Sequence, residues 1–145
     1  MSPRGQRLDG SLGHWAARLS WAARGALERR LKQHGLTPPM MAALLLVDEG
    51  HKRGTDLAKE MGVDAAAVTR LLDRMAGAGW LQRCEMEGDR RSHLLELSKK
   101  ALDLLPKLRA LAVKMEEELG DILSPGEKVI LIRQLKALAE AAEKL

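Results

Sequence analysis

The sequence contains no phenylalanine, no tyrosine and only three tryptophans in 145 residues. A core without these rings must consist of leucine, alanine, valine, isoleucine and methionine, a composition that favours helices over sheets. Hydrophobic residues make up 46% of the chain and charged residues 30%. This is enough apolar material for a core, which argues against wholesale disorder, and the length suits one domain with appended helices.

Cysteine and long apolar runs are also scarce. Cys84 is the only cysteine, so no disulfide can form within the chain, which fits a reducing compartment. The longest nearly continuous apolar run, residues 40–47, is much too short to cross a bilayer. The first ten residues lack the apolar segment of a signal peptide. We therefore expect a soluble, cytoplasmic protein without a membrane partner.

Patterns that carry catalysis or bind metals are missing as well. The four histidines are scattered, with no second histidine or cysteine at the spacing of a metal site. No nucleophile–base pair or phosphate-binding loop is visible. The sequence therefore predicts no enzyme, no cofactor and no metal centre. Oxidation sensing through Cys84, or metal sensing, is kept as an alternative function.

The formal net charge is +4, which permits binding to nucleic acid without proving it. Residues 52–91 hold eight basic and seven acidic side chains, so this segment is almost neutral. A surface for DNA on this segment would therefore depend on where individual arginines lie and not on bulk charge.

The chain is organised around residues 54–97. Two short helical patterns flank a turn at Gly62, and two alternating runs, residues 80–85 and 92–97, surround a polar tip of residues 86–91. This order predicts a helix-turn-helix followed by a β-hairpin, which is a winged helix. Thr55 and Asp64 are expected to cap the two helices. The inward face of the second helix would consist of four apolar residues, Val68, Leu71, Leu72 and Met75.

Long helical patterns flank this stretch. Apolar residues recur at spacings of three and four from Leu12 to Leu31, and Gly35 follows as a plausible cap. Thr37 and Pro38 open a central apolar helix. A helix capped by Ser98 would contain Pro106, which implies a kink or a later start. Residues 124–127, Ser-Pro-Gly-Glu, have the pattern of a capping box and open the last helix.

The winged helix needs only part of the apolar surface on these outer helices. Unused stripes on terminal helices usually pack on a second copy of the chain. We therefore expect residues 1–36 and 98–145 to form a dimerisation domain around a winged helix-turn-helix of residues 37–97. A monomeric helical bundle that covers its own stripes is the competing interpretation.

In this order the motifs resemble the MarR family of bacterial transcriptional regulators. The resemblance covers nearly the whole chain and rests on LTPP at 36–39, VTRLLDRM at 68–75, the step from Gly79 to Arg83, the wing Asp-x-Arg at 89–91 and LSPGE at 123–127. It implies a mainly α fold with a small β-hairpin wing. It also implies a homodimeric repressor of a pseudo-palindromic DNA operator, relieved by a small phenolic or aromatic-acid effector. A protein-interaction module that does not bind DNA is the alternative.

The candidate DNA-binding residues lie on the second helix of the helix-turn-helix and in the wing. Small side chains at Ala65 and Ala66 let the backbone approach DNA closely. The guanidinium of Arg70 can bind a guanine edge, with Thr69 beside it and Arg74 directed to phosphate. In the wing, the resemblance implies that Asp89 orients Arg91 toward the minor groove or phosphate, and Arg90 between them is a further phosphate contact.

The resemblance also implies an effector pocket between the dimer helices and the DNA-binding lobes. Five residues would line it here: His14, Trp15, Arg18, Met40 and Met41. Packing of these side chains in the dimer is the competing interpretation. Trp80 is instead expected to fill the junction between the second helix of the helix-turn-helix and the hairpin.

Overall fold

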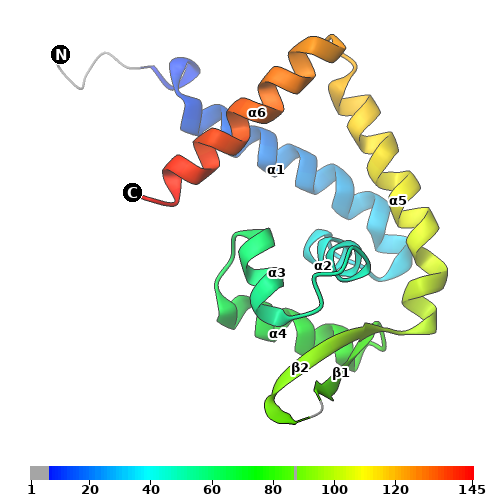
Figure 1. The fold of residues 1–145 in the computed structure, drawn as a ribbon. Coiled ribbons are helices and arrows are strands. Elements are labelled where there is room, and N and C mark those ends of the chain that lie inside the picture. The colour runs from blue at the N-terminus through cyan, green and yellow to red at the C-terminus, as the bar shows by residue number, and fades with distance from the viewer. Residues whose placement is uncertain (1–6, 87) are drawn as a thin grey trace. The chain divides into compact units, whose positions relative to one another are not determined.

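The computed structural model describes residues 7–86 and 88–145, with the side chains of residues 89–92 left out. Its elements are α1 (Leu12–Leu31), α2 (Pro38–Asp48), α3 (Gly54–Met61), α4 (Ala65–Gly77), β1 (Leu81–Met86), β2 (Asp89–Leu97), α5 (Lys99–Gly120) and α6 (Pro125–Ala142) (Figure 1). The predicted mainly α fold with one antiparallel hairpin is confirmed. The chain forms two compact units that divide between Leu105 and Pro106.

Helix α2 is the centre of the first unit. It contacts α1, α3, α4 and β2, and it buries Met41, Ala43, Leu44 and Val47. The hydroxyl of Thr37 accepts a hydrogen bond from the backbone N–H of Met40, and prolines follow at the first helical positions. An N-cap threonine before proline is a strong helix start, and the apolar run behind it needs neighbours on several faces. Both sequence predictions for this helix are confirmed.

The helix-turn-helix consists of α3 and α4, which pack against each other. Gly62 ends α3 in the left-handed conformation at φ 66°, and the Asp64 carboxylate accepts from the Ala67 N–H at 2.7 Å to cap α4. The predicted cap of α3 is wrong. This helix begins at Gly54, two residues earlier than a Thr55 cap implies, and Arg53 precedes it without a side-chain cap. Packing on α4 sets its start, and it overrides the capping preference of Thr55.

Helix α4 buries the predicted stripe of Val68, Leu71, Leu72 and Met75. It ends in a Schellman motif, in which Gly79 has a φ of 79° and the N–H of Trp80 donates to the Met75 carbonyl at 2.9 Å. Trp80 is 5% exposed, so its predicted place in the core is confirmed. The motif turns the chain directly from α4 into β1.

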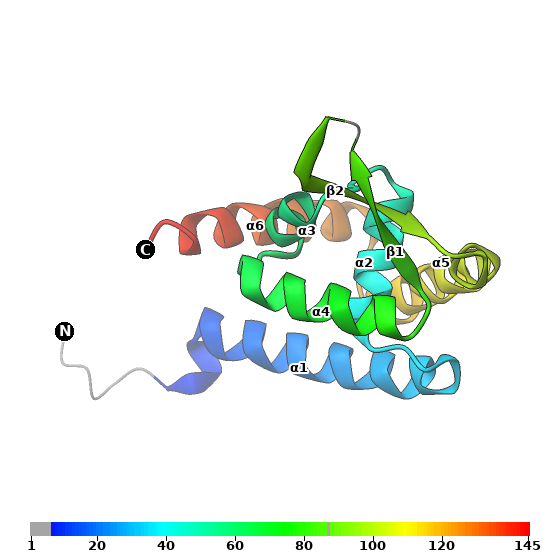
Figure 2. The same ribbon diagram turned by 90° about the horizontal axis from the view of Figure 1, so that it is seen from below.

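The hairpin is longer than the alternating pattern predicted. Strand β1 reaches Met86 and β2 starts at Asp89, so the six-residue polar tip is wrong. The pairing shifts between Glu85 and Met86, where Glu85 pairs with His93 and Met86 with Asp89. Polar residues at an exposed tip lack the period-two apolar signal, although their backbones still form a ladder. The hairpin projects from the group of α2, α3 and α4 (Figure 1 and Figure 2).

The start of α5 follows the prediction. The Ser98 hydroxyl accepts from the N–H of Ala101 at 3.2 Å, and the helix continues through Pro106 instead of starting later. In the second unit α6 opens with the predicted capping box between Ser124 and Glu127. An ion pair of 3.3 Å between Lys128 and Glu116 joins α6 to α5. None of the helices described is both long and apolar enough to cross a membrane.

Candidate nucleic-acid interface

The outward surface of α4 carries two rows of exposed side chains. Residues four apart on a helix lie above one another. The first row, called here the arginine row, consists of Ala66, Arg70 and Arg74. The second, the threonine row, consists of Ala65, Thr69 and Asp73. All five α4 residues that the sequence predicted for DNA binding lie exposed on these two rows.

The arginine row is suited to a duplex. Ala66 leaves space at the first turn of α4, where backbone N–H groups without helical partners can approach a phosphate. Arg70 and Arg74 follow on the same face, both exposed. A planar guanidinium can donate two parallel hydrogen bonds to a guanine edge or to a phosphate. A small residue followed by two arginines therefore presents close approach and anion recognition on one helical face.

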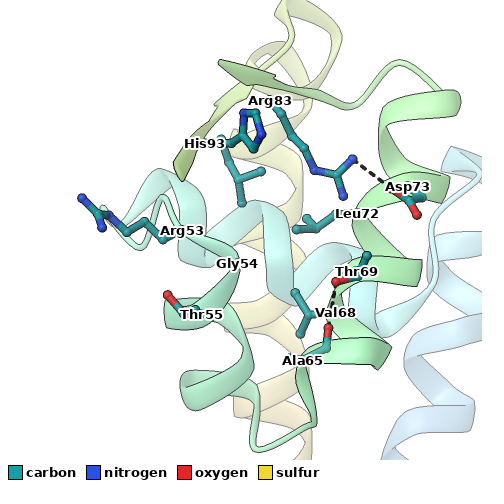
Figure 3. A pocket seen from close by; sticks show the side chains of 11 residues that line it. Arg53, Gly54, Thr55, Ala65, Val68, Thr69, Leu72, Asp73, Arg83 and His93 are labelled. Atoms are coloured by element: carbon teal, nitrogen blue, oxygen red, sulfur yellow. Dashed lines mark hydrogen bonds and ion pairs between the residues drawn. The ribbon is translucent and has the colours of Figure 1, made fainter. Parts of the chain in front are cut away.

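The threonine row borders a hollow of about 620 Å³, called here the α4 hollow (Figure 3). Arg53 and Thr55 at the start of α3, Arg83 on β1 and His93 on β2 line its other walls. The Thr69 hydroxyl donates to the Ala65 carbonyl at 2.9 Å. Its proton is thereby engaged within the helix, so Thr69 meets another group only as an acceptor or through its methyl group.

An ion pair connects the hairpin to α4. The Arg83 guanidinium lies 2.9 Å from the Asp73 carboxylate across the α4 hollow. The pairing offsets the negative charge of Asp73 on the outward surface of α4. Sequence reasoning used Arg83 only as part of a family motif and gave it no role. Its partner lies ten positions earlier in a different element, and no local spacing rule connects a helix to a strand.

The hairpin holds a second polar cluster on its surface. The Cys84 thiol donates to a Glu96 carboxylate oxygen at 3.0 Å, and the Gln82 amide donates to the same oxygen at 3.2 Å. The hydrogen bond between Cys84 and Glu96 raises the pKa of Cys84, and burial and the charge of Glu96 raise it further. The same hydrogen bond, followed by that from Gln82, lowers the pKa of Glu96. Cys84 is therefore held as a protonated donor.

The wing residues Asp89, Arg90 and Arg91 have backbones in β2, but their side chains lie outside the described part of the chain. Their assignment to DNA therefore stays a prediction. The backbone places them beside the hairpin tip, which projects from the helices (Figure 2).

The residues predicted for an effector pocket are not gathered around either of the two hollows described here. On α1, Trp15 makes an edge contact with His14 at 5.5 Å between ring centroids, and the Arg18 guanidinium lies 5.0 Å from the Trp15 ring. Met40 is half-buried and Met41 belongs to the core. A second hollow, of about 670 Å³, is formed on α1 by Ala17, Ser20, Trp21, Arg24, Gly25 and Glu28.

Comparison with known proteins decides what kind of protein presents this surface. The sequence profile of the MarR family matches residues 36–93. A Bacillus subtilis (strain 168) protein described as an uncharacterized HTH-type transcriptional regulator, YfiV, is 31% identical over 126 residues, which cover 86% of this chain and 78% of that protein. The chain belongs to the MarR family. As a member of the MarR family it is a DNA-binding transcriptional regulator and not an enzyme.

Solved MarR-family structures share the fold. A mutant of MarR from E. coli in complex with operator DNA superimposes with a TM-score of 0.79 at 24% identity, covering 88% of this chain and 92% of that chain. CouR from Rhodococcus jostii RHA1, bound to p-coumaroyl-CoA, gives a TM-score of 0.82 at 20% identity and covers 93% of this chain and 96% of that chain. At these identities the likeness establishes the winged-helix fold alone.

Proposed function

We propose that the chain is a homodimeric repressor that binds a pseudo-palindromic operator through α4 and the wing. The arginine row carries this proposal. Ala66, Arg70 and Arg74 share an exposed face of a helix whose opposite face is fixed in the core. A recognition helix held in this way can enter a major groove with its N-terminal half directed at the bases. Arg90 and Arg91 would hold the neighbouring backbone or minor groove.

A dimer is supported by the second unit. Helix α6 has no buried residue in the single chain, although it carries Val129, Ile130, Leu131, Ile132, Leu135 and Leu138. Exposed apolar surface of this extent on a soluble regulator requires a partner, and a second copy would cover it symmetrically. Two copies also present two recognition helices, which read two half-sites about one helical turn apart.

The repressor proposal is tested by selecting the duplexes that the protein binds from genomic fragments. The affinity of the protein for the selected operator is then measured by fluorescence anisotropy. Arg70→Ala should cost about 1–3 kcal/mol on the selected operator and reduce the preference for it over mutated half-sites. Arg29→Ala is the matched control, because it removes the same charge from the exposed last turn of α1. If no fragment binds, the repressor proposal fails and the alternative of a protein-interaction module is favoured. Equal behaviour of both variants would remove Arg70 from base recognition.

We also propose that a small-molecule effector relieves repression, and two sites are candidates for binding it. The α4 hollow has the size of a small-molecule site and one wall made by the recognition helix. Arg53, Arg83 and Asp73 are the charged residues that line it, and Asp73 pairs with Arg83, so the lining keeps a net positive charge that suits an aromatic carboxylate. A ligand there would contact the element that reads DNA. The cluster of His14, Trp15 and Arg18 on α1 is the other location, where a ligand would act through the dimer.

A panel of phenolic and aromatic acids can separate the two locations. Release of operator by an active acid is measured for Arg83→Met and for Arg18→Met, each of which loses one guanidinium. Loss of the response only in Arg83→Met favours the α4 hollow, and loss only in Arg18→Met favours α1. If no acid releases the operator from the unmodified protein, the effector class is wrong.

A further inference from the structure

A lysine of α5 contacts the end of the recognition helix. The ammonium of Lys100, in the first turn of α5, donates to the backbone carbonyl of Ala78 at 2.7 Å. It also lies 3.9 Å from the centroid of the Trp80 ring. These residues flank Gly79, where the chain leaves α4 for β1. One side chain thus joins α5 to the link between α4 and β1.

The carbonyl of Ala78 accepts neither of the two backbone hydrogen bonds that close the end of α4. The Schellman motif satisfies the carbonyls of Met75 and Ala76 with the N–H groups of Trp80 and Gly79. Ala78 lies beyond these two bonds, at the negative end of the helix. A cation stabilises a helix C-terminus through both its charge and its hydrogen bond. Lys100 therefore completes the cap of α4 from another helix.

The Trp80 ring gives the ammonium a second, fixed contact. The ring is almost fully buried, so it does not follow the lysine if the lysine moves. An ammonium over an aromatic face is attracted by the electron density of the ring. The backbone adds a parallel link, because the N–H of Ser98 donates to the Trp80 carbonyl at 3.0 Å. The start of α5 and the end of α4 are thus joined at two points.

We propose that Lys100 is a positioning residue that sets the direction of the recognition helix, so that loss of its ammonium weakens operator binding without touching DNA. The proposal rests on the DNA-binding function proposed above. Helix α4 has 13 residues, which makes it about 20 Å long, so a tilt of about 3° at its end moves its first turn by about 1 Å. The bases are read at that first turn, by hydrogen bonds that tolerate little displacement.

The route of α5 adds a consequence for the dimer. This helix starts beside α4 and continues past Pro106 into the second unit, which carries the exposed apolar surface. Lys100 thus ties α4 to the helix that leads toward the proposed dimerisation surface. In a two-fold dimer each copy has this restraint on α4, so a loss of its direction affects the contacts at both half-sites.

Lys100→Met tests the proposal, because methionine keeps most of the aliphatic chain and removes the ammonium. Lys99→Met is the matched control, since this neighbour is also exposed on the same helix and loses the same charge. Operator affinity, preference for half-site spacing and thermal midpoint are measured for both variants and for Lys100→Arg. We expect Lys100→Met to bind about tenfold more weakly than Lys99→Met, because fewer molecules hold a competent α4.

The spacing preference separates positioning from simple stability. Operators with one base pair added or removed between half-sites should be discriminated less by Lys100→Met than by the unmodified protein, and Lys100→Arg should restore both affinity and discrimination. Equal loss of affinity in the Lys99 and Lys100 methionine variants would overturn the proposal, since charge alone would then explain it. A lowered thermal midpoint with unchanged affinity and discrimination would also overturn it. If the unmodified protein selects no duplex, the proposed function itself fails.

Discussion

At the scale of single residues, a carboxylate accepts a hydrogen bond from the only cysteine at 3.0 Å. The pKa of Cys84 is raised, chiefly because its thiol donates to Glu96. The thiolate is the species that attacks alkylating and oxidising reagents, so a raised pKa makes Cys84 less reactive at neutral pH. This arrangement disfavours the oxidation-sensing alternative, because a sensor cysteine needs an accessible thiolate.

Glu96→Ala should therefore increase the rate at which iodoacetamide alkylates Cys84. The rate is measured by mass spectrometry at about pH 8, below the usual pKa of a thiol. Glu85→Ala is the control, because it removes a carboxylate next to Cys84 that is not its hydrogen-bond partner. Equal rates in the two variants would show that general charge, and not the hydrogen bond, controls the thiol.

The residues that sequence reasoning placed correctly act locally. Thr37, Asp64 and Ser124 each bond a backbone N–H three residues ahead, so a spacing rule suffices to find them. Lys100 acts on a carbonyl 22 residues away in the chain, and Arg83 acts on a carboxylate in another element. Such contacts depend on how elements pack, and neither residue has a local pattern that distinguishes it from a solvated charge.

At the scale of elements, the helices were more predictable than the hairpin. Periodic apolar residues define α1, α4 and α6 because one face of each must leave water or meet a partner, and the continuous apolar run of α2 indicates a helix buried on several faces. The hairpin tip has no such requirement, and its strands were therefore predicted too short. At the junction between the hairpin and α4, the buried Trp80 was predictable, whereas the partly exposed ion pair between Arg83 and Asp73 was not.

The ion pair between Asp73 and Arg83 should couple the hairpin weakly to α4. Their side chains are 61% and 31% exposed, respectively, so solvent screens the attraction. A double-mutant cycle with Asp73→Asn and Arg83→Met, followed by urea unfolding, should give a coupling free energy of about 0.2–1 kcal/mol that falls as salt is added. A coupling that does not change with salt would indicate that packing, and not charge, joins the two side chains.

The capping box of α6 should make a pH-dependent contribution to the free energy of unfolding. Hydrogen bonds from the Ser124 hydroxyl and then from its backbone N–H lower the pKa of Glu127. A lowered carboxyl pKa adds stability above the unfolded pKa, and this stability is lost as the pH falls through the folded value. Ser124→Ala should cost about 1 kcal/mol at neutral pH, as loss of an N-cap does.

The cost of Ser124→Ala should shrink in acid, below the lowered pKa of Glu127. Urea unfolding followed by circular dichroism at neutral pH and at about pH 3 measures it. Glu140→Gln, at an exposed position later in α6, controls for general charge effects in the same helix. A cost of Ser124→Ala that is the same at both pH values would contradict the linkage.

At the scale of the whole molecule, the apolar side chains of α6 stay exposed to solvent in a single chain. Val129 is 67% exposed and Leu135 is 42% exposed, and no residue of α6 is buried. The sequence predicted this exposed apolar surface, because the terminal helices carry apolar stripes that the winged helix does not need to form its core. It could not predict which residues of another chain cover it, because one sequence does not contain the geometry between two copies.

Leu135→Glu places a charge in this apolar surface and should dissociate the proposed dimer. Gln134→Glu is the control, since it adds the same charge at the adjacent exposed residue. Sedimentation gives the oligomeric state, and the salt dependence of operator binding gives an independent count of phosphate contacts. Because each neutralised phosphate contributes about 0.9 to the slope of log affinity against log salt, a monomer with half the contacts should show about half the slope. A Leu135→Glu protein that stays dimeric with the full slope would show that α6 is not the surface that pairs the two recognition helices.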